Sequence, residues 1–309
     1  MASPIPTHDI DPFFVFDYQP VDGGGPLTSD APSTRLSSYW DVVKSNRGPQ
    51  PLPDWVVTDA GSVDTDLGIL KTGKEADVYL LERAVPATAT HAAGPRGLMA
   101  AKRYRTAEHR AFHRSTAYTD GRRMKKSRDT RALERGSRYG RELAAGQWAY
   151  AEWEALNRYW CAGLPVPYPV QLDGTEILME FIGDTDGVAA PRLAEVRPDS
   201  DVLRRYYDQF ARAVTMMAAS GAAHGDLSAY NVLADGDDIV VIDLPQVIDL
   251  AGNPRGSEFL MRDCRNMCSW FTSRGLAVDP RVVFDQAWSA LSARALTKRL
   301  PRRTVESPS

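Results

Sequence analysis

The 309-residue chain has only three cysteines, and their placement argues against both a disulfide framework and a cysteine metal site. Cys161, Cys264 and Cys268 form no CxxC pair, so we expect buried thiols in a reducing compartment. No apolar run reaches the roughly 18 residues of a membrane span. The N-terminus has neither the basic region nor the apolar stretch of a signal peptide. These absences predict a cytoplasmic protein that does not bind a membrane.

The net charge of −3 conceals a strongly basic segment between Lys102 and Arg141. In this segment lysine and arginine far outnumber the acids Glu108, Asp120 and Asp129 together with Glu134. A solvated loop is the simplest interpretation. Positive charge alone is sufficient to bind nucleic-acid phosphates, so RNA or an acidic protein is the alternative partner of segment 102–141.

The length suits an enzyme of two lobes, and composition suggests where they lie. Residues 1–50 are rich in Pro, Gly and Ser and are predicted to be disordered. Residues 51–182 form a predicted β-rich N-lobe, interrupted by a flexible basic loop at about 105–141. Residues 183–300 form a predicted α-rich C-lobe, and 301–309 a disordered tail. The fold class expected is therefore α+β.

Hydrophobic periodicity and turn residues place the elements within these lobes. The predicted strands are 55–58, 67–70, 76–81, 98–104, 176–182 and 240–242, and residues 84–97 are predicted to be a surface insertion. The predicted helices are 144–160, 201–220, 259–274 and 280–299. No internal repeat is present.

The most informative stretch is the segment from His224 to Leu233, which places Asp226 five positions before Asn231. A second carboxylate, Asp243, ends the apolar strand 240–242. Phosphoryl transfer needs a carboxylate that orients the acceptor hydroxyl and oxygen ligands that hold metal ions at the phosphates. An aspartate in a glycine-containing loop is usually a turn former. The fixed spacing to two further metal-ligating residues favours the phosphoryl-transfer interpretation.

Several motifs in the right order resemble the RIO group of atypical serine/threonine protein kinases, over roughly residues 61–275. They are Thr72-Gly73-Lys74-Glu75-Ala76-Asp77-Val78-Tyr79, His224-Gly225-Asp226-Leu227-Ser228-Ala229-Tyr230-Asn231, Leu178-Met179-Glu180-Phe181-Ile182-Gly183, Glu258-Phe259-Leu260, Asp263-Cys264 and Asn266. The resemblance implies a two-lobed protein-kinase-like fold. Nothing at the N-terminus resembles a winged helix, so the chain looks closer to the subfamily that lacks one.

The resemblance implies an ATP site with Mg²⁺, or Mn²⁺ as an alternative, and assigns its residues. Asp226, Lys102 and Asp243 are the expected catalytic residues, and Asn231 and Asp243 the metal ligands. His224 is expected to be structural. The expected ATP-binding residues are Thr72, Gly73, Lys74, Glu75, Ala76, Val78, Lys102, Glu152, Met179, Glu180, Ile182 and Ser228.

Each assignment also has a simpler interpretation from the residues alone. The Thr72–Glu75 turn is an ordinary hairpin turn unless its N–H groups and the Thr72 hydroxyl bind phosphate. Lys102 is a surface lysine unless a helix carboxylate fixes it. Glu152 and Glu154 are both candidates for that carboxylate, and two residues apart on a helix they point about 200° away from each other.

One departure from ordinary kinases affects the expected function. Leu244-Pro245-Gln246 follows Asp243, and no Ala-Pro-Glu motif comes after it, so a conventional activation segment is not expected. The favoured function is a serine/threonine kinase that phosphorylates proteins or itself. The resemblance implies one alternative, an ATPase switch acting on RNA or ribosomal particles, in which Asp243 takes up phosphate. The other alternative is a small-molecule phosphotransferase like the aminoglycoside and choline kinases.

Overall fold

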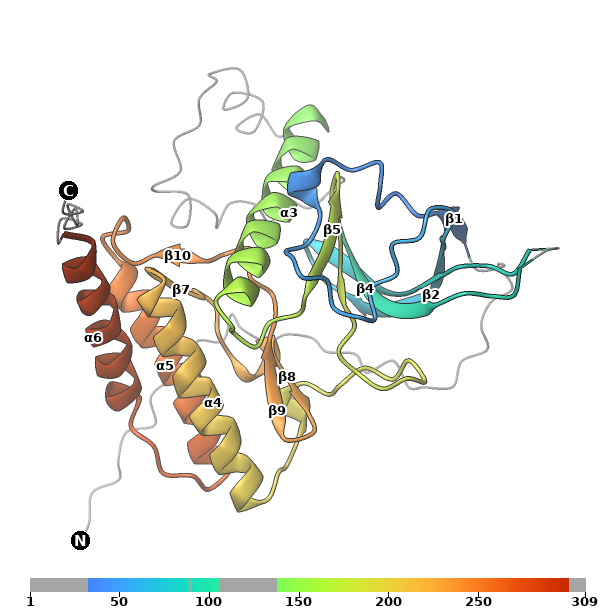
Figure 1. The fold of residues 1–309 in the computed structure, drawn as a ribbon. Helices are drawn as coiled ribbons and strands as arrows, with labels where there is room; N and C mark the ends of the chain where they lie inside the picture. The colour runs from blue at the N-terminus through green and yellow to red at the C-terminus, as the bar shows by residue number, and fades with distance from the viewer. Residues whose placement is uncertain (1–32, 89–90, 106–137, 300–309) are drawn as a thin grey trace, which may run out of the picture.

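The computed structural model describes residues 33–88, 91–105 and 138–299, which form an antiparallel sheet followed by a group of helices (Figure 1). The sheet has the strand order β1-β2-β3-β4-β6-β5. Its strands are β1 (Thr34–Leu36), β2 (Val63–Thr72), β3 (Ala76–Ala84), β4 (Arg96–Tyr104), β5 (Pro169–Asp173) and β6 (Glu176–Glu180). The predicted α+β class is confirmed.

The C-terminal part is mainly helical. Its helices are α4 (Ser200–Ala219), α5 (Gly256–Ser273) and α6 (Pro280–Arg299), and α3 (Arg138–Cys161) precedes β5. Two small ladders pair β7 (Ala222–Ala223) with β10 (Ile248–Asp249) and β8 (Val232–Asp235) with β9 (Asp238–Val241). The short 3-10 helices are η1 (Lys44–Asn46), η3 (Leu193–Glu195) and η4 (Ala229–Asn231).

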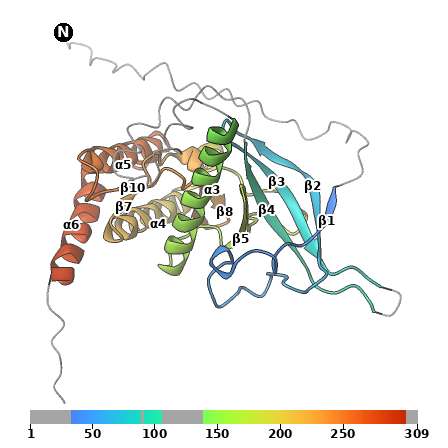
Figure 2. The ribbon, with the colours of Figure 1, turned by 90° about the horizontal axis from the view of Figure 1, so that it is seen from above.

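Side chains alternate across β4 and divide the core between the two faces of the sheet. On the inner face Tyr104 packs with Trp153 of α3, and this cluster continues into the C-terminal helices. On the outer face Met99 and Ala101 pack with Tyr39. Figure 2 shows α3 between the sheet and the helices α4, α5 and α6. The inner face therefore looks toward the helical part of the molecule.

Residues 33–58, here called the covering segment, differ from the prediction of disorder through residue 50. β1 pairs with β2, and Tyr39 is only 3% exposed against the outer face of the sheet. Trp55 also packs there, edge-to-face on Tyr168, but residues 55–58 form no strand, so that predicted strand is wrong. Isolated aromatic anchors order this segment without a periodic pattern that the sequence could reveal. Residues 1–32 lie outside the described residues.

The hairpin of β2 and β3 confirms the predicted strands 67–70 and 76–81. Its turn requires glycine at position 73, because a Cβ there would lie 2.8 Å from the Ala76 carbonyl oxygen. The Gly73 N–H donates to that same oxygen at 2.9 Å and closes the turn. The sequence of this turn is thus constrained by backbone packing before any ligand is considered.

The predicted helices 144–160, 201–220, 259–274 and 280–299 are confirmed, although α3 begins at Arg138, well before its predicted start. α4 begins at an Asp199 cap whose side chain accepts from the N–H groups of Asp201 and Val202. Strand β5 had no prediction. Residues 244–255 are all that separate Asp243 from α5, which agrees with the expected lack of a conventional activation segment.

Three remaining expectations concern cysteines, membrane spans and the basic segment. Cys264 and Cys268 are buried as expected, whereas Cys161 is exposed at the end of α3. Within the described residues, no helix has the length and apolar character needed to cross a membrane. Of the basic segment 102–141, residues 106–137 lie outside the part of the chain that the structure describes.

Candidate active site

The loop from His224 to Leu233, here called the HGD loop, is held in shape by a buried histidine ring. His224 is 1% exposed, and its Nδ1 accepts from the Asp226 N–H at 3.3 Å. Its Nε2 lies 3.0 Å from the Ile242 carbonyl oxygen. An accepting Nδ1 leaves the proton on Nε2, so the ring donates to Ile242. His224 therefore links the HGD loop to the segment that carries Asp243.

A second anchor of the HGD loop comes from α5. The Asp263 carboxylate accepts from the Gly225 N–H at 2.8 Å and from the Leu227 N–H at 3.0 Å. Asp263 is 1% exposed, and burial raises its pKa to about 6. Asn266, one turn further along α5, donates to the Leu227 carbonyl oxygen at 3.2 Å. These bonds fix the main chain on both sides of Asp226.

Asp226 lies between these anchors with a partly exposed side chain. Burial raises the pKa of its carboxyl above the ordinary value, and the negative charges of Asp243 and Glu75 act in the same direction. The nearby His224 and Arg262 oppose that rise. A carboxylate with a raised pKa is a better proton acceptor than an ordinary aspartate, which suits a residue that orients a hydroxyl.

The structure brings Asn231 and Asp243 together through the backbone. The Ile242 N–H donates to the Asn231 carbonyl oxygen at 3.0 Å, which places Asp243 one residue beyond that bond. The Asn231 side chain donates through Nδ2 to the Asp226 carbonyl oxygen at 2.9 Å, so its Oδ1 is the atom suited to a metal ion. Amide and carboxylate oxygens are the ligands that Mg²⁺ prefers. The two residues fit such an ion.

Lys102 contributes a cation directly to this group. Its Nζ lies 2.7 Å from Oε1 of Glu152 and 2.8 Å from Oδ1 of Asp243. Burial alone lowers the pKa of Lys102, but the two carboxylates raise it well above its ordinary range. The same ion pair lowers the pKa of Asp243, against the effect of burial. Lys102 and Asp243 therefore both carry their charge at neutral pH.

Glu152 is the fixed member of this trio. It is 1% exposed, and Tyr104 donates its hydroxyl to Oε2 while the Leu244 N–H donates to Oε1 at 3.2 Å. Of the two glutamates that the sequence left open, Glu152 contacts Lys102. Glu154 is exposed and is hydrogen-bonded to Tyr150 on the same helix.

Asp243 has a positive φ of 67°, which is uncommon for a residue other than glycine. Aspartate is among the residues that adopt this left-handed region most readily. The conformation occurs directly after Ile242, where the chain leaves the pairing with Asn231. The backbone therefore turns sharply at the residue whose side chain meets Lys102.

The glycine turn between β2 and β3 is placed by the register of the sheet. Val78 pairs with Lys102, and directly opposed residues share one face, so Val78 lies on the inner face. Thr72 pairs with Asp77, which pairs with Arg103 on the outer face. The expectation that the Thr72 hydroxyl meets phosphate is not supported by this register. Ala76 is buried on the inner face, whereas Gly73, Lys74 and Glu75 form the turn itself.

The predicted hinge follows β6. Met179 and Ile182 are each 8% exposed. Glu180 forms two hydrogen bonds with Tyr168. Its N–H donates to the Tyr168 carbonyl oxygen at 2.8 Å, and its side chain accepts from the Tyr168 N–H at 3.0 Å. The Ile182 carbonyl oxygen accepts from the Ala190 N–H at 3.0 Å. These groups of Glu180 and Ile182 are thus engaged within the protein.

Several residues of the site had no assignment from the sequence. Tyr104 and Asp263 support Glu152 and the HGD loop, and Arg192 donates to the Tyr230 carbonyl oxygen. Lys71 lies on the inner face opposite Val78. The sequence signal for Lys71 is its position beside the glycine turn. Arg192 has no such signal, because it comes from a connector that approaches the HGD loop only in the fold.

The sequence profile of the RIO domain matches residues 89–283. The chain belongs to the RIO domain family. The matched region includes Lys102, Glu152, Asp226, Asn231 and Asp243, whereas the glycine turn lies before it.

Curated relatives carry the same family name. The RIO-type serine/threonine-protein kinase Rio1 of Haloferax volcanii is 32% identical over 230 residues, which are 73% of this chain and 69% of that protein. Serine/threonine-protein kinase RIO3 of Caenorhabditis elegans is 33% identical over 226 residues, 72% of this chain and 39% of that protein. The predicted family, the RIO-type serine/threonine kinases, is confirmed. The chain spans less than half of RIO3.

Solved structures of Rio2 kinase from Chaetomium thermophilum are similar at a lower level. One is 17% identical with a TM-score of 0.48, and the match covers 77% of this chain and 70% of that chain. Another, in complex with ADP, Mg²⁺ and phosphoaspartate, is 18% identical with a TM-score of 0.46, covering 76% and 68%. The expected lack of a winged helix stays a prediction.

Proposed function

We propose that this chain transfers the γ-phosphoryl group of ATP to a serine or threonine hydroxyl, on another protein or on itself, with Mg²⁺ as cofactor. The observation that carries the proposal is the ion-paired trio of Lys102, Glu152 and Asp243 beside the anchored HGD loop. Phosphoryl transfer requires positioning and charge neutralisation more than covalent participation by the protein. The trio supplies charge, and the anchored loop supplies positioning.

Each residue takes a role that its surroundings support. Asp226, with its raised pKa, holds the acceptor hydroxyl and takes its proton. Lys102, fixed by Glu152, binds the inner phosphates. Asn231 Oδ1 and the Asp243 carboxylate hold Mg²⁺, which supplies charge neutralisation at the phosphate oxygens when bound. Mn²⁺ would be accepted by the same oxygen ligands.

The remaining predicted contacts surround the nucleotide. The turn at Gly73, Lys74 and Glu75 approaches the phosphates, with the Gly73 N–H held by the Ala76 carbonyl oxygen, and Val78 and Ala76 line the inner face beside it. Met179, Glu180 and Ile182 approach the base at the hinge. Ser228 directly precedes η4, with its carbonyl oxygen accepting from the Asn231 N–H at 2.9 Å, and is a further phosphate contact.

The deciding experiment incubates the protein with γ-labelled ATP and Mg²⁺ and locates the label. We expect labelled serine or threonine, abolished in Asp226→Asn and in Asp243→Asn, with circular dichroism unchanged. Asp237→Asn is the matched control, since Asp237 is 68% exposed in the turn between β8 and β9, and it should transfer label as the unmodified chain does. Full transfer by Asp226→Asn would refute the assignment of Asp226.

The same experiment separates the ATPase alternative from the kinase. Label on an aspartate, or label released only as free phosphate, would instead indicate a nucleotide-driven switch. Binding of RNA or a ribosomal particle through segment 102–141 is a separate proposal, and salt-sensitive RNA binding that survives Asp226→Asn would support it. The cytoplasmic location likewise stays a prediction.

A further inference from the structure

Lys71 lies in the same row of the sheet as the active-site lysine. Lys71 pairs with Val78 on β3, and Val78 pairs with Lys102 on β4. Directly opposed residues in antiparallel strands project to the same face. Two strand spacings separate the lysines, about 10 Å between their Cα atoms. Both lysines therefore project from the inner face, with Val78 between them.

An irregularity in β2 sets this orientation. The register shifts between Ile69 and Lys71, so that Leu70 is an extra residue relative to β3. Such a bulge changes the face to which the following side chains point. Without it, the alternation that continues from Ile69 would turn Thr72 to the inner face and Lys71 away. Because of the bulge, the Lys71 ammonium group, and not the Thr72 hydroxyl, lies on the inner face beside the glycine turn.

A second cation lies beside the HGD loop. The Arg192 guanidinium donates to the Tyr230 carbonyl oxygen, which fixes its charge next to that loop. The Lys71 side chain is exposed, and partial desolvation and then the positive charge of Arg192 lower its pKa, although Asp243 and Glu75 act to raise it. In the part of the chain that the structure describes, neither Lys71 nor Arg192 forms an ion pair.

We propose that Lys71 and Arg192 together bind the terminal phosphate of the nucleotide, Lys71 from the sheet and Arg192 from the loop side. The proposal rests on the nucleotide site of the proposed function and extends it. Lys102 is occupied by Glu152 and Asp243 and serves the inner phosphates. Two cations that repel each other gain most from an anion placed between them, and a phosphate group supplies up to two negative charges.

The experiment measures dissociation constants, by calorimetry with Mg²⁺, for a non-hydrolysable ATP analogue, ADP and AMP. Lys71→Met should weaken binding of the triphosphate roughly tenfold through loss of a charge-assisted hydrogen bond. Binding of ADP should weaken less than binding of the triphosphate, and binding of AMP should not change. Lys71→Arg should retain most of the triphosphate affinity. Lys44→Met is the matched control, because Lys44 is an exposed lysine of η1 and should change none of the three constants.

Arg192→Met tests the partner. It should selectively weaken binding of the triphosphate analogue. The double variant with Lys71→Met should lose less binding free energy than the sum of the losses in the two single variants. Equal weakening of all three nucleotides by Lys71→Met, or no weakening, would overturn the proposal. A chain that binds the triphosphate through Lys71 yet transfers no label would refute the proposed function alone. Transfer with unchanged nucleotide preference in Lys71→Met would refute only the Lys71 assignment.

Discussion

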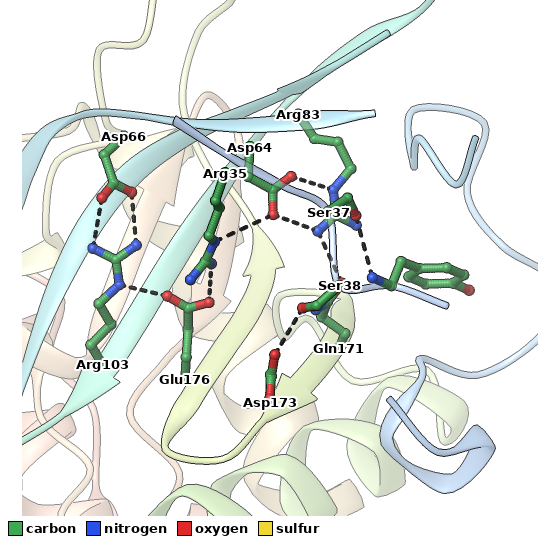
Figure 3. Close-up of polar contacts among 11 residues, drawn as sticks. Arg35, Ser37, Ser38, Asp64, Asp66, Arg83, Arg103, Gln171, Asp173 and Glu176 are labelled. Carbon is green, nitrogen blue, oxygen red and sulfur yellow. Dashed lines mark hydrogen bonds and ion pairs between the residues drawn. The ribbon is translucent and has the colours of Figure 1, made fainter. Parts of the chain in front are cut away.

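The ion pair between Arg83 and Asp64 lies buried on the outer face of the sheet, where the covering segment meets it (Figure 3). Each side chain is 1% exposed. Arg83 donates from Nε and Nη2 to the two Asp64 carboxylate oxygens, at 2.6 and 2.9 Å. Nη2 also donates to Gln171 at 2.9 Å, and Gln171 donates to Ser38 of the covering segment at 2.9 Å. The pair therefore connects β2, β3, β5 and the covering segment.

We predict that Asp64→Asn destabilises the protein by about 3–5 kcal/mol, because it leaves the Arg83 guanidinium buried without its counter-charge. An amide also presents an NH₂ group where a carboxylate oxygen accepted a hydrogen bond, so one Arg83 donor faces another donor. At roughly 2–4 °C per kcal/mol for a chain of this size class, the midpoint of thermal unfolding should fall by about 10 °C.

Urea unfolding followed by circular dichroism gives the free energy of unfolding, and thermal unfolding gives the midpoint. Glu258→Gln is the matched control: it breaks the Arg255–Glu258 pair, whose side chains are 63% and 64% exposed, and should cost less than about 1 kcal/mol. The double variant Asp64→Leu with Arg83→Met should recover most of the loss, because both charges leave the interior together. A loss in Asp64→Asn no larger than in Glu258→Gln would refute this account.

Two further predictions concern groups that support the site. Burial raises the folded-state pKa of Asp263 to about 6 from the ordinary 3.8, so its contribution to the free energy of unfolding is fully present below about pH 4 and is lost as the pH rises through 6. Urea unfolding of Asp263→Asn and of the unmodified chain gives the free energy of unfolding of each. The value for Asp263→Asn minus the value for the unmodified chain should therefore rise by about 3 kcal/mol between about pH 4 and pH 7. A difference that does not change with pH would contradict this. Tyr104→Phe leaves Oε2 of Glu152 buried without its hydroxyl donor, at a cost of about 1–3 kcal/mol in the same assay, and label transfer should fall with it. Unchanged stability in Tyr104→Phe would show that Glu152 does not depend on that bond.

The parts of the fold with strong periodicity could be predicted from the sequence. The hairpin of 67–81 has apolar, β-branched arms around a glycine turn, and the helix of 144–160 has regular apolar spacing that ends at Gly163. The covering segment could not be predicted, because it is ordered by separate contacts of Tyr39 and Trp55 with residues far along the chain. Such contacts leave no local pattern.

The candidate site shows the same division. The spacing of Asp226, Asn231 and Asp243 identified residues that the backbone brings together, since a hydrogen bond joins Asn231 to Ile242. The sheet face of Lys71 and Thr72 was harder to predict, because a shift of one residue reverses the face of every later side chain in a strand. The bulge before Lys71 has no composition that marks it. Arg192 depends on tertiary placement alone.

The covering segment also decides where the gene can be trimmed for expression. The region matched to the RIO domain starts at residue 89, between β3 and β4, so cutting there would discard three of the six strands of the large sheet. Starting at residue 51 keeps those strands except β1 but removes Tyr39 and Ser38 from the outer face. A trimmed product must therefore keep the covering segment, because products that lack Tyr39 and Ser38 would expose an apolar surface prone to aggregation.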